Sequence, residues 1–302
     1  MRTFDPRSFW LAGVVGAVSL LASGPVQAVD GVIEINQAKV KAGGVTPGDT
    51  PLFPVTISQS GSYRLTGNLD VADATARPPG MAAQDTNAIE IRAPSVTIDL
   101  NGFAIMGPNV CSCCPFSCTR NGSGRGIITS APASDVAVMN GTVRGMGLDG
   151  MLLEGASVID RVRVLHNAGV GINTGGAVTN CFALRNGVGI NGGAVSNSVA
   201  QGNGDRGITS PNGSVANSSA TDNRGRGIEG TTVTACTALR NDGEGIDAET
   251  VTGSTSHFNG RDGIRATTVT GSFAESNSGP EQIKATGIAG QNICGNPGTP
   301  CP

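Results

Sequence analysis

The chain has 302 residues, of which 46 are glycine and 8 are cysteine, and its formal net charge is -3. Only 3% of the residues are aromatic and 14% are charged, which argues against a helical bundle and against a highly charged disordered chain. The small negative charge gives no electrostatic reason to bind nucleic acid, so we expect no such partner.

Residues 1–28 have the three parts of a secretory signal. Arg2 and Arg7 make the start basic, an apolar run covers residues 9–22, and small residues precede an expected cleavage after Ala28. The apolar run is short for a membrane span, although an N-terminal anchor is the alternative, and we expect no transmembrane segment after the signal is removed. The sequence therefore predicts export to the periplasm, the cell surface or the medium, where disulfides form.

Residues 29–86 contain five prolines and a strand-like stretch over residues 61–67, and they precede a long series of repeats. Because a stack of repeats must cover its open ends, we predict an N-terminal cap followed by a first irregular turn.

A cysteine-rich insertion covers residues 107–125, between the alternating segments that begin at residues 96 and 136. Its four cysteines are Cys111, Cys113, Cys114 and Cys118. We expect a loop that projects from one corner of the fold. Cysteines this close together bind zinc or form two disulfides, and export favours disulfides, whose pairing the sequence leaves open.

The chain repeats over residues 87–293, most regularly after residue 168. In each repeat a glycine precedes an isoleucine, a valine follows five to seven residues later, and an asparagine closes the turn. The isoleucines, at spacings of 18, 18, 20, 18 and 18, are Ile172, Ile190, Ile208, Ile228, Ile246 and Ile264. Turns of this length stack with strands paired in parallel about 4.8 Å apart, so each set becomes an internal file. We predict an all-β, single-domain parallel β-helix.

Two further features of the repeat bear on handedness and on the thiols. A left-handed coil of hexapeptides needs an aliphatic residue every six positions, whereas six steps from Ile228 give Thr234 and then Arg240, so we predict a right-handed coil. Cys181 and Cys236 share an internal file with serines but lie three turns apart. That separation of about 14 Å excludes a disulfide, so we predict two buried free thiols.

The segments Val-Thr-Ile-Asp-Leu-Asn-Gly-Phe (96–103) and Met-Asn-Gly-Thr-Val-Arg-Gly (139–145), followed by the Gly-Ile…Val…Asn turns, resemble bacterial right-handed parallel β-helix repeat proteins of the pectate-lyase-like superfamily. The resemblance covers residues 87–293, about two thirds of the chain. It implies the fold and leaves the activity open, because that superfamily contains lyases, hydrolases and epimerases.

The asparagines that close the turns form a predicted ladder. They are Asn167, Asn186, Asn203, Asn223, Asn241, Asn259 and Asn277. Stacked amides hydrogen-bond along the axis of such a coil, which favours a structural role, and a sugar-binding strip is the alternative.

The residue after each isoleucine should point outward and form another file. It contains Asn173, Asn191, Thr209, Glu229, Asp247, Arg265 and Lys284. The resemblance implies a site of the kind found in calcium-dependent uronan lyases, in which Glu229 and Asp247 bind calcium and Arg226 or Arg265 takes a proton. The alternative is a solvated ladder of alternating charges, with no cofactor.

The tail, residues 294–302, contains Cys294 and Cys301, which we expect to close an eight-residue loop.

Neither a Gly-His-Gly nor an Asp-Pro-His-Asp string is present, and His166 and His257 occupy different positions of the repeat. The sequence therefore favours a non-catalytic exported scaffold that contacts polysaccharide. The alternative is a lyase or epimerase acting on acidic polysaccharide, and stacked Thr-Val-Thr triplets at residues 232, 250 and 268 suggest an ice-binding face as a third.

Overall fold

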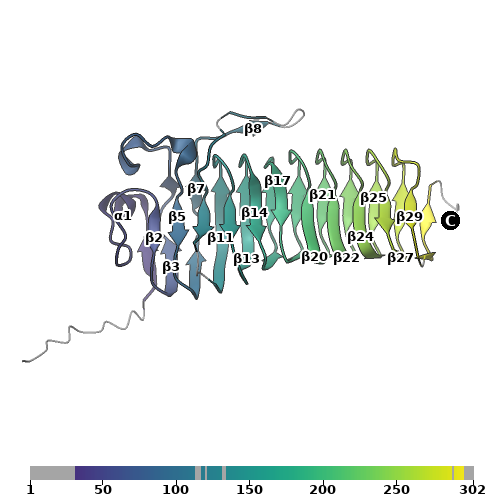
Figure 1. The fold of residues 1–302 in the computed structure, drawn as a ribbon, viewed down its shortest axis with the longest axis horizontal. Helices are drawn as coiled ribbons and strands as arrows, with labels where there is room; N and C mark the ends of the chain where they lie inside the picture. The colour runs from purple at the N-terminus through teal and green to yellow at the C-terminus, as the bar shows by residue number, and fades with distance from the viewer. Residues whose placement is uncertain (1–30, 113–116, 120, 131–133, 288, 296–302) are drawn as a thin grey trace, which may run out of the picture. The chain divides into compact units, whose positions relative to one another are not determined.

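The computed structural model describes residues 31–302 except 113–116, 120, 131–133, 288 and 296–302. The expected signal therefore lies outside the described residues, as do Cys113, Cys114 and Cys301. From Val32 onward the chain forms one compact unit, in which strands stack in parallel along an axis (Figure 1). The protein is an all-β parallel β-helix, as predicted, and its handedness stays a prediction.

The stack has three faces, which we name after the residue that each turns inward. The Ile face consists of β2 (Val55–Ile57), β5 (Ile89–Ile91), β10 (Ile127–Thr129), β12 (Met151–Leu153), β14 (Val170–Thr174), β17 (Val188–Asn191), the first parts of β20 (Ile208–Ala216), β22 (Ile228–Thr234) and β24 (Ile246–Thr252), β26 (Ile264–Ala266) and β29 (Ile283–Ala285).

The Val face consists of β1 (Ile33–Ile35), β3 (Gly61–Leu65), β6 (Val96–Asp99), the first parts of β11 (Val136–Arg144) and β13 (Val158–Leu165), β15 (Ala177–Thr179), β18 (Ala194–Ser196), the second parts of β20, β22 and β24, β27 (Thr268–Thr270) and β30 (Ala289–Gly290). The Thr-Val-Thr triplets lie here in register, on β22, β24 and β27.

The Ala face consists of β4 (Leu69–Asp70), β7 (Ala104–Met106), the second parts of β11 and β13, β16 (Phe182–Leu184), β19 (Val199–Gln201), β21 (Ser219–Thr221), β23 (Thr237–Leu239), β25 (Thr255–His257), β28 (Phe273–Glu275) and β31 (Ile293–Cys294).

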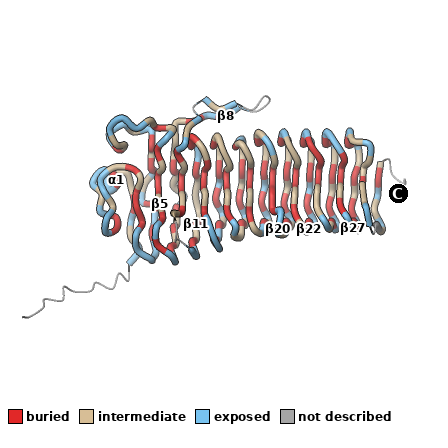
Figure 2. Tube along the Cα trace, in the orientation of Figure 1, coloured by how far each residue is buried: buried red, intermediate tan, exposed pale blue. Residues whose placement is uncertain are grey.

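The core is a set of internal files, and buried residues alternate with half-buried or exposed ones along the strands (Figure 2). Ile190 pairs with Ile208, Ile208 with Ile228, and Ile228 with Ile246, all with no exposed surface. Full burial of each isoleucine stabilises the stack by about 1.5–3 kcal/mol relative to an exposed one. The predicted internal file is confirmed.

The two cysteines within the repeats are buried free thiols, as predicted. The backbone N–H of Cys181 donates to the Ser198 hydroxyl, and that of Cys236 donates to the Ser254 hydroxyl, each at 3.1 Å. Burial raises the pKa of Cys181 to about 11 and raises the pKa of Cys236.

Parallel pairing begins at Ile33, within the segment expected to be a cap. That segment also contains helix α1 (Gln37–Ala42), which begins after Asn36 and buries Val40 in the core, and the short 3-10 helices at Ala74–Ala76 and Ala83–Asp85. Among the described residues, no helix combines the length and hydrophobicity that crossing a bilayer requires.

The cysteine-rich insertion forms the antiparallel strands β8 (Cys111–Ser112) and β9 (Ser117–Cys118), joined by a Cys111–Cys118 disulfide. These two residues are therefore a disulfide pair rather than zinc ligands. Nδ1 of His166 lies 2.7 Å from the Cys111 carbonyl oxygen and holds the insertion against the stack. Cys294 is also disulfide-bonded.

Candidate functional site: a groove on the Ile face

Two files of side chains cover the outside of the Ile face. One is the predicted file after the isoleucines, which the register places on successive strands in the expected order from Asn173 to Lys284. The other file lies two residues before each isoleucine and includes Arg206, Arg226 and Glu244. Backbone hydrogen bonds from Gly207 to Arg226 and from Gly227 to Glu244 stack these residues turn upon turn.

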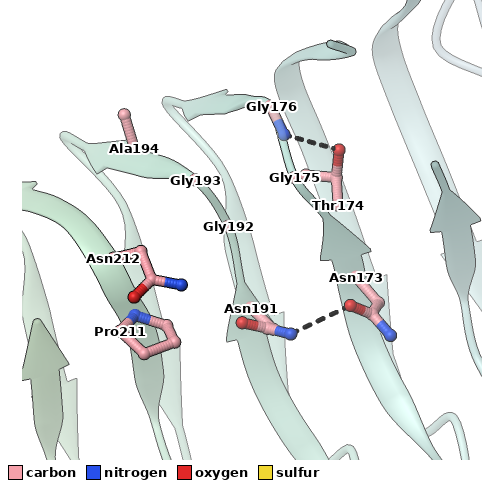
Figure 3. Close-up of a pocket in the computed structure, with 10 residues that line it drawn as sticks. All are labelled: Asn173, Thr174, Gly175, Gly176, Asn191, Gly192, Gly193, Ala194, Pro211 and Asn212. Atoms are coloured by element: carbon pink, nitrogen blue, oxygen red, sulfur yellow. Dashed lines mark hydrogen bonds between the residues drawn. The ribbon is translucent and has the colours of Figure 1, made fainter. Parts of the chain in front are cut away.

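A hollow of about 510 Å³ opens on this face over β14, β17 and β20 (Figure 3). Its polar side chains are mainly the amides of Asn173, Asn191 and Asn212, so we call it the amide hollow. The Asn191 amide nitrogen donates to the Asn173 amide oxygen at 2.9 Å. This bond uses neither the Asn173 amide nitrogen nor the Asn191 amide oxygen. A sugar hydroxyl can accept from such a nitrogen and donate to such an oxygen.

Glycines make the amide hollow possible. The hollow includes the backbone of Gly175, Gly176, Gly192 and Gly193, none of which fills it with a side chain. A Cβ at Gly193 would lie 2.0 Å from the Gly175 carbonyl oxygen, and one at Gly176 would lie 1.8 Å from that of Ser157. Close stacking of the turns at this corner thus excludes larger residues and leaves a depression outside.

A bulge in β20 bounds the amide hollow. Ser210 and Ser214 pair with Gly230 and Thr232, so four steps on β20 match two on β22 and two residues are extra. The Thr231 hydroxyl donates to the Pro211 carbonyl oxygen at 3.1 Å, which ties the bulge to the next turn. These two extra residues explain why the spacing between Ile208 and Ile228 is 20, whereas the other isoleucine spacings are 18.

Beyond the bulge a second hollow of about 240 Å³ is lined by Pro211, Glu229, Thr231, Asp247 and Glu249, together with Gly230 and Ala248. We call it the acidic hollow. Since Pro211 lines both hollows, they are neighbours along the axis, and we name the two together the axial groove. It crosses β14, β17, β20, β22 and β24.

Arg226 joins the carboxylates of the groove in an ion-pair network. Its guanidinium lies 3.3 Å from Glu229 Oε2, 3.2 Å from Glu244 Oε2 and 3.3 Å from Asp247 Oδ2. Arg206 also lies 3.3 Å from Glu229 Oε2. The sequence placed Glu229, Asp247 and Arg226 in one candidate site but left open whether Arg226 shares the face of the two carboxylates, because a bend separates the two files. The Arg226 side chain reaches across that bend.

Arg265 continues the network on the next turn. Its Nε and Nη2 donate to the two Asp247 oxygens in a bidentate pair, and its Nη1 lies 3.4 Å from Glu244 Oε1. The bond to Asp247 raises the pKa of Arg265, against a smaller effect of burial. Burial lowers the pKa of Arg226, but Asp247, Glu244 and Glu229 outweigh it, so that pKa is raised too.

This arrangement does not fit the calcium site that the resemblance implies. Guanidinium groups already lie against both Glu229 and Asp247, so the positive charge there comes from arginine. Within the described part of the chain, no three His, Cys, Asp or Glu side chains are grouped to hold a metal ion. The raised pKa values also make Arg226 and Arg265 poor proton acceptors.

The seven closing asparagines form one buried file. Nδ2 of Asn203, Asn223, Asn241 and Asn259 donates to Oδ1 of the next asparagine at about 2.8–2.9 Å, and backbone N–H groups donate to the same oxygens. Asn167 and Asn186 begin the file, and Asn277 ends it on Gln282. Each is 7% exposed or less, so these amides bond along the axis and not to a sugar outside.

Tyr63 and the two histidines lie away from the groove. Tyr63 is interior, where its hydroxyl donates to the Gln59 carbonyl oxygen and burial raises its pKa to about 12. His257 lies on the Ala face, with its ring centroid 4.9 Å from that of Phe273. His166 holds the cysteine-rich insertion.

Several solved structures are similar to this one. Among them are the mannuronan C-5 epimerase AlgE6 A-module of Azotobacter vinelandii (17% identity, TM-score 0.47, 78% of this chain and 72% of that one), a mutant of the periplasmic alginate epimerase AlgG (11%, 0.49, 80% and 71%) and the Dettilon tailspike protein (14%, 0.43, 79% and 52%). At these values the likeness concerns the fold alone. No family model matches the chain, and no curated protein sequence matches it.

Proposed function

We propose that this protein is an exported, non-catalytic β-helix that binds a polysaccharide chain along the axial groove. The observation that carries the proposal is the groove itself, two hollows in line with amides at one end and carboxylates at the other. From Asn173 to Asp247 the register makes four inter-strand steps, or about 19 Å, which suits an extended chain rather than a compact ligand.

The lining groups match the chemistry of a sugar. Hydroxyl groups donate and accept hydrogen bonds, and the amides and carboxylates of the groove supply partners for both. The lining residues include no aromatic ring, so binding would depend on hydrogen bonds of about 1 kcal/mol each rather than on ring stacking. We therefore expect modest affinity, spread over several sugar units.

A binding role rather than catalysis is favoured by the state of the charged groups. A general acid or base needs a pKa near the working pH, whereas the basic groups beside the groove are arginines whose pKa values are raised further. Glu229 and Asp247 are each paired with guanidinium groups. Export is supported by the Cys111–Cys118 disulfide and the bonded Cys294, which are typical of an oxidising compartment.

Calorimetric titration of the mature protein with a panel of soluble polysaccharides tests the proposal. At least one should bind, and Asn191→Ala should weaken binding about fivefold, which corresponds to one hydrogen bond. Thr234→Ala, an exposed change on the Val face, is the matched control and should leave affinity unchanged. Failure to bind any polysaccharide would overturn the proposal.

The alternative function is a lyase or epimerase acting on acidic polysaccharide. The observation in its favour is that Arg226 and Arg265 lie against Glu229 and Asp247 beside a groove. Incubation with pectate or alginate plus calcium would reveal a lyase by the ultraviolet absorbance of unsaturated product, abolished in Asp247→Ala. Proton NMR of the recovered polymer would reveal an epimerase, and our proposal predicts neither change.

A further inference from the structure

We infer that the polysaccharide in the axial groove is uncharged rather than anionic. This inference rests on the proposed function and concerns the same groove. It departs from the acidic substrates of the alternative function.

The charge of the lining carries this inference. The two hollows are lined by Glu229, Asp247 and Glu249 and by no arginine or lysine. Arg206, Arg226 and Arg265 are each engaged in ion pairs with carboxylates of this face, so none offers an unpaired cation to a polyanion. A uronate chain would place its carboxylates against those of the groove, and like charges in contact disfavour binding.

Glu249 strengthens the argument because nothing neutralises it. It is exposed at the rim of the acidic hollow, and among the described residues it makes no ion pair. Its carboxylate can accept hydrogen bonds from sugar hydroxyls, and such bonds to a charged acceptor are stronger than neutral ones. A ligand carboxylate lacks a proton to donate there.

The test compares polysaccharide classes. Calorimetric titrations at low salt would use laminarin, galactomannan and dextran as uncharged chains, and alginate and polygalacturonate as anionic ones. We expect at least one uncharged chain to bind, with both anionic chains at least about tenfold weaker. Glu249→Lys should improve alginate binding, and Glu275→Lys on the Ala face, with the same change of charge, should improve it much less.

The outcomes separate this inference from the proposed function. Binding of alginate or polygalacturonate at least as tight as that of every uncharged chain would overturn the inference and keep the proposed function. Failure to bind any chain would overturn both. Equal gains in alginate binding from Glu249→Lys and Glu275→Lys would show that net charge, not the groove, sets the preference.

Discussion

The asparagine file provides the sharpest test of how the stack is held together, and Asn241→Ala is the change to make. The Asn241 side chain donates to the Ala220 carbonyl oxygen at 3.0 Å and to Asn259 Oδ1 at 2.9 Å. Its Oδ1 accepts from the backbone N–H of Asn223 at 3.1 Å and from Asn223 Nδ2 at 2.8 Å. Asn241 is 1% exposed, so water cannot replace these partners.

Alanine at this position leaves two donors of Asn223, the backbone N–H and one amide proton, without an acceptor. Each buried unpaired group costs about 1–3 kcal/mol, so we expect the free energy of unfolding to fall by about 4 kcal/mol. Thr237→Ala on β23 of the same turn is exposed and should change it by less than about 0.5 kcal/mol.

Urea unfolding followed by circular dichroism measures both variants. Because stacked repeats can open locally, hydrogen exchange at the Asn223 amide should be read as well, and it should accelerate in Asn241→Ala. If the two variants were equally stable and the Asn223 amide stayed protected, the hydrogen bonds of the asparagine file would not stabilise the stack, and our reasoning would be wrong.

Three further predictions follow from close packing, burial and charge. Gly193→Ala should lower the free energy of unfolding by about 3 kcal/mol, because its Cβ would meet a backbone oxygen at 2.0 Å. Gly230→Ala, whose Cβ would have its nearest atoms at 3.4 Å, should be close to neutral. Urea unfolding measures both variants, and equal effects would contradict the packing argument. Cys181 and Cys236 should resist a thiol reagent at pH 8 until the protein unfolds, because both are buried with raised pKa values, and rapid labelling of the folded protein would refute this. Burial raises the pKa of Glu244, but its hydrogen bonds and Arg226 outweigh burial, so the pKa of the folded state is lowered. The contribution of Glu244 to stability should therefore be present above about pH 4.3 and be lost as the pH falls through the folded pKa. The free energies of unfolding of wild type and Glu244→Gln should differ at neutral pH and converge in acid, and a constant difference across this range would contradict the reasoning.

Much of the fold follows from the sequence because a stacked coil repeats the same environment at each turn. Ile208, Ile228 and Ile246 occupy one internal file, so the need to bury each recurs at a constant spacing that can be counted. Departures from the repeat were harder to interpret. The spacing of 20 at Ile208 marks the bulge at Pro211, but the hollows on either side of it depend on where neighbouring backbones approach each other.

The candidate site was predictable only in part for a related reason. The order of Glu229 and Asp247 in the outward file follows from the register, and the structure places them as expected. The involvement of Arg226 and Glu244 depends on the direction of long side chains across a bend, which periodicity does not specify. The pairing of Cys111 with Cys118 likewise depends on the path of an insertion that belongs to no repeat.

The structure of a complex between the mature protein and an oligosaccharide of the uncharged chain that binds would test the central claim most directly. Our account predicts an intact saccharide lying along the axis on the Ile face, with hydroxyl groups at Asn191 and Glu249. A saccharide bound on the Val or Ala face, or one recovered cleaved or epimerised, would contradict it.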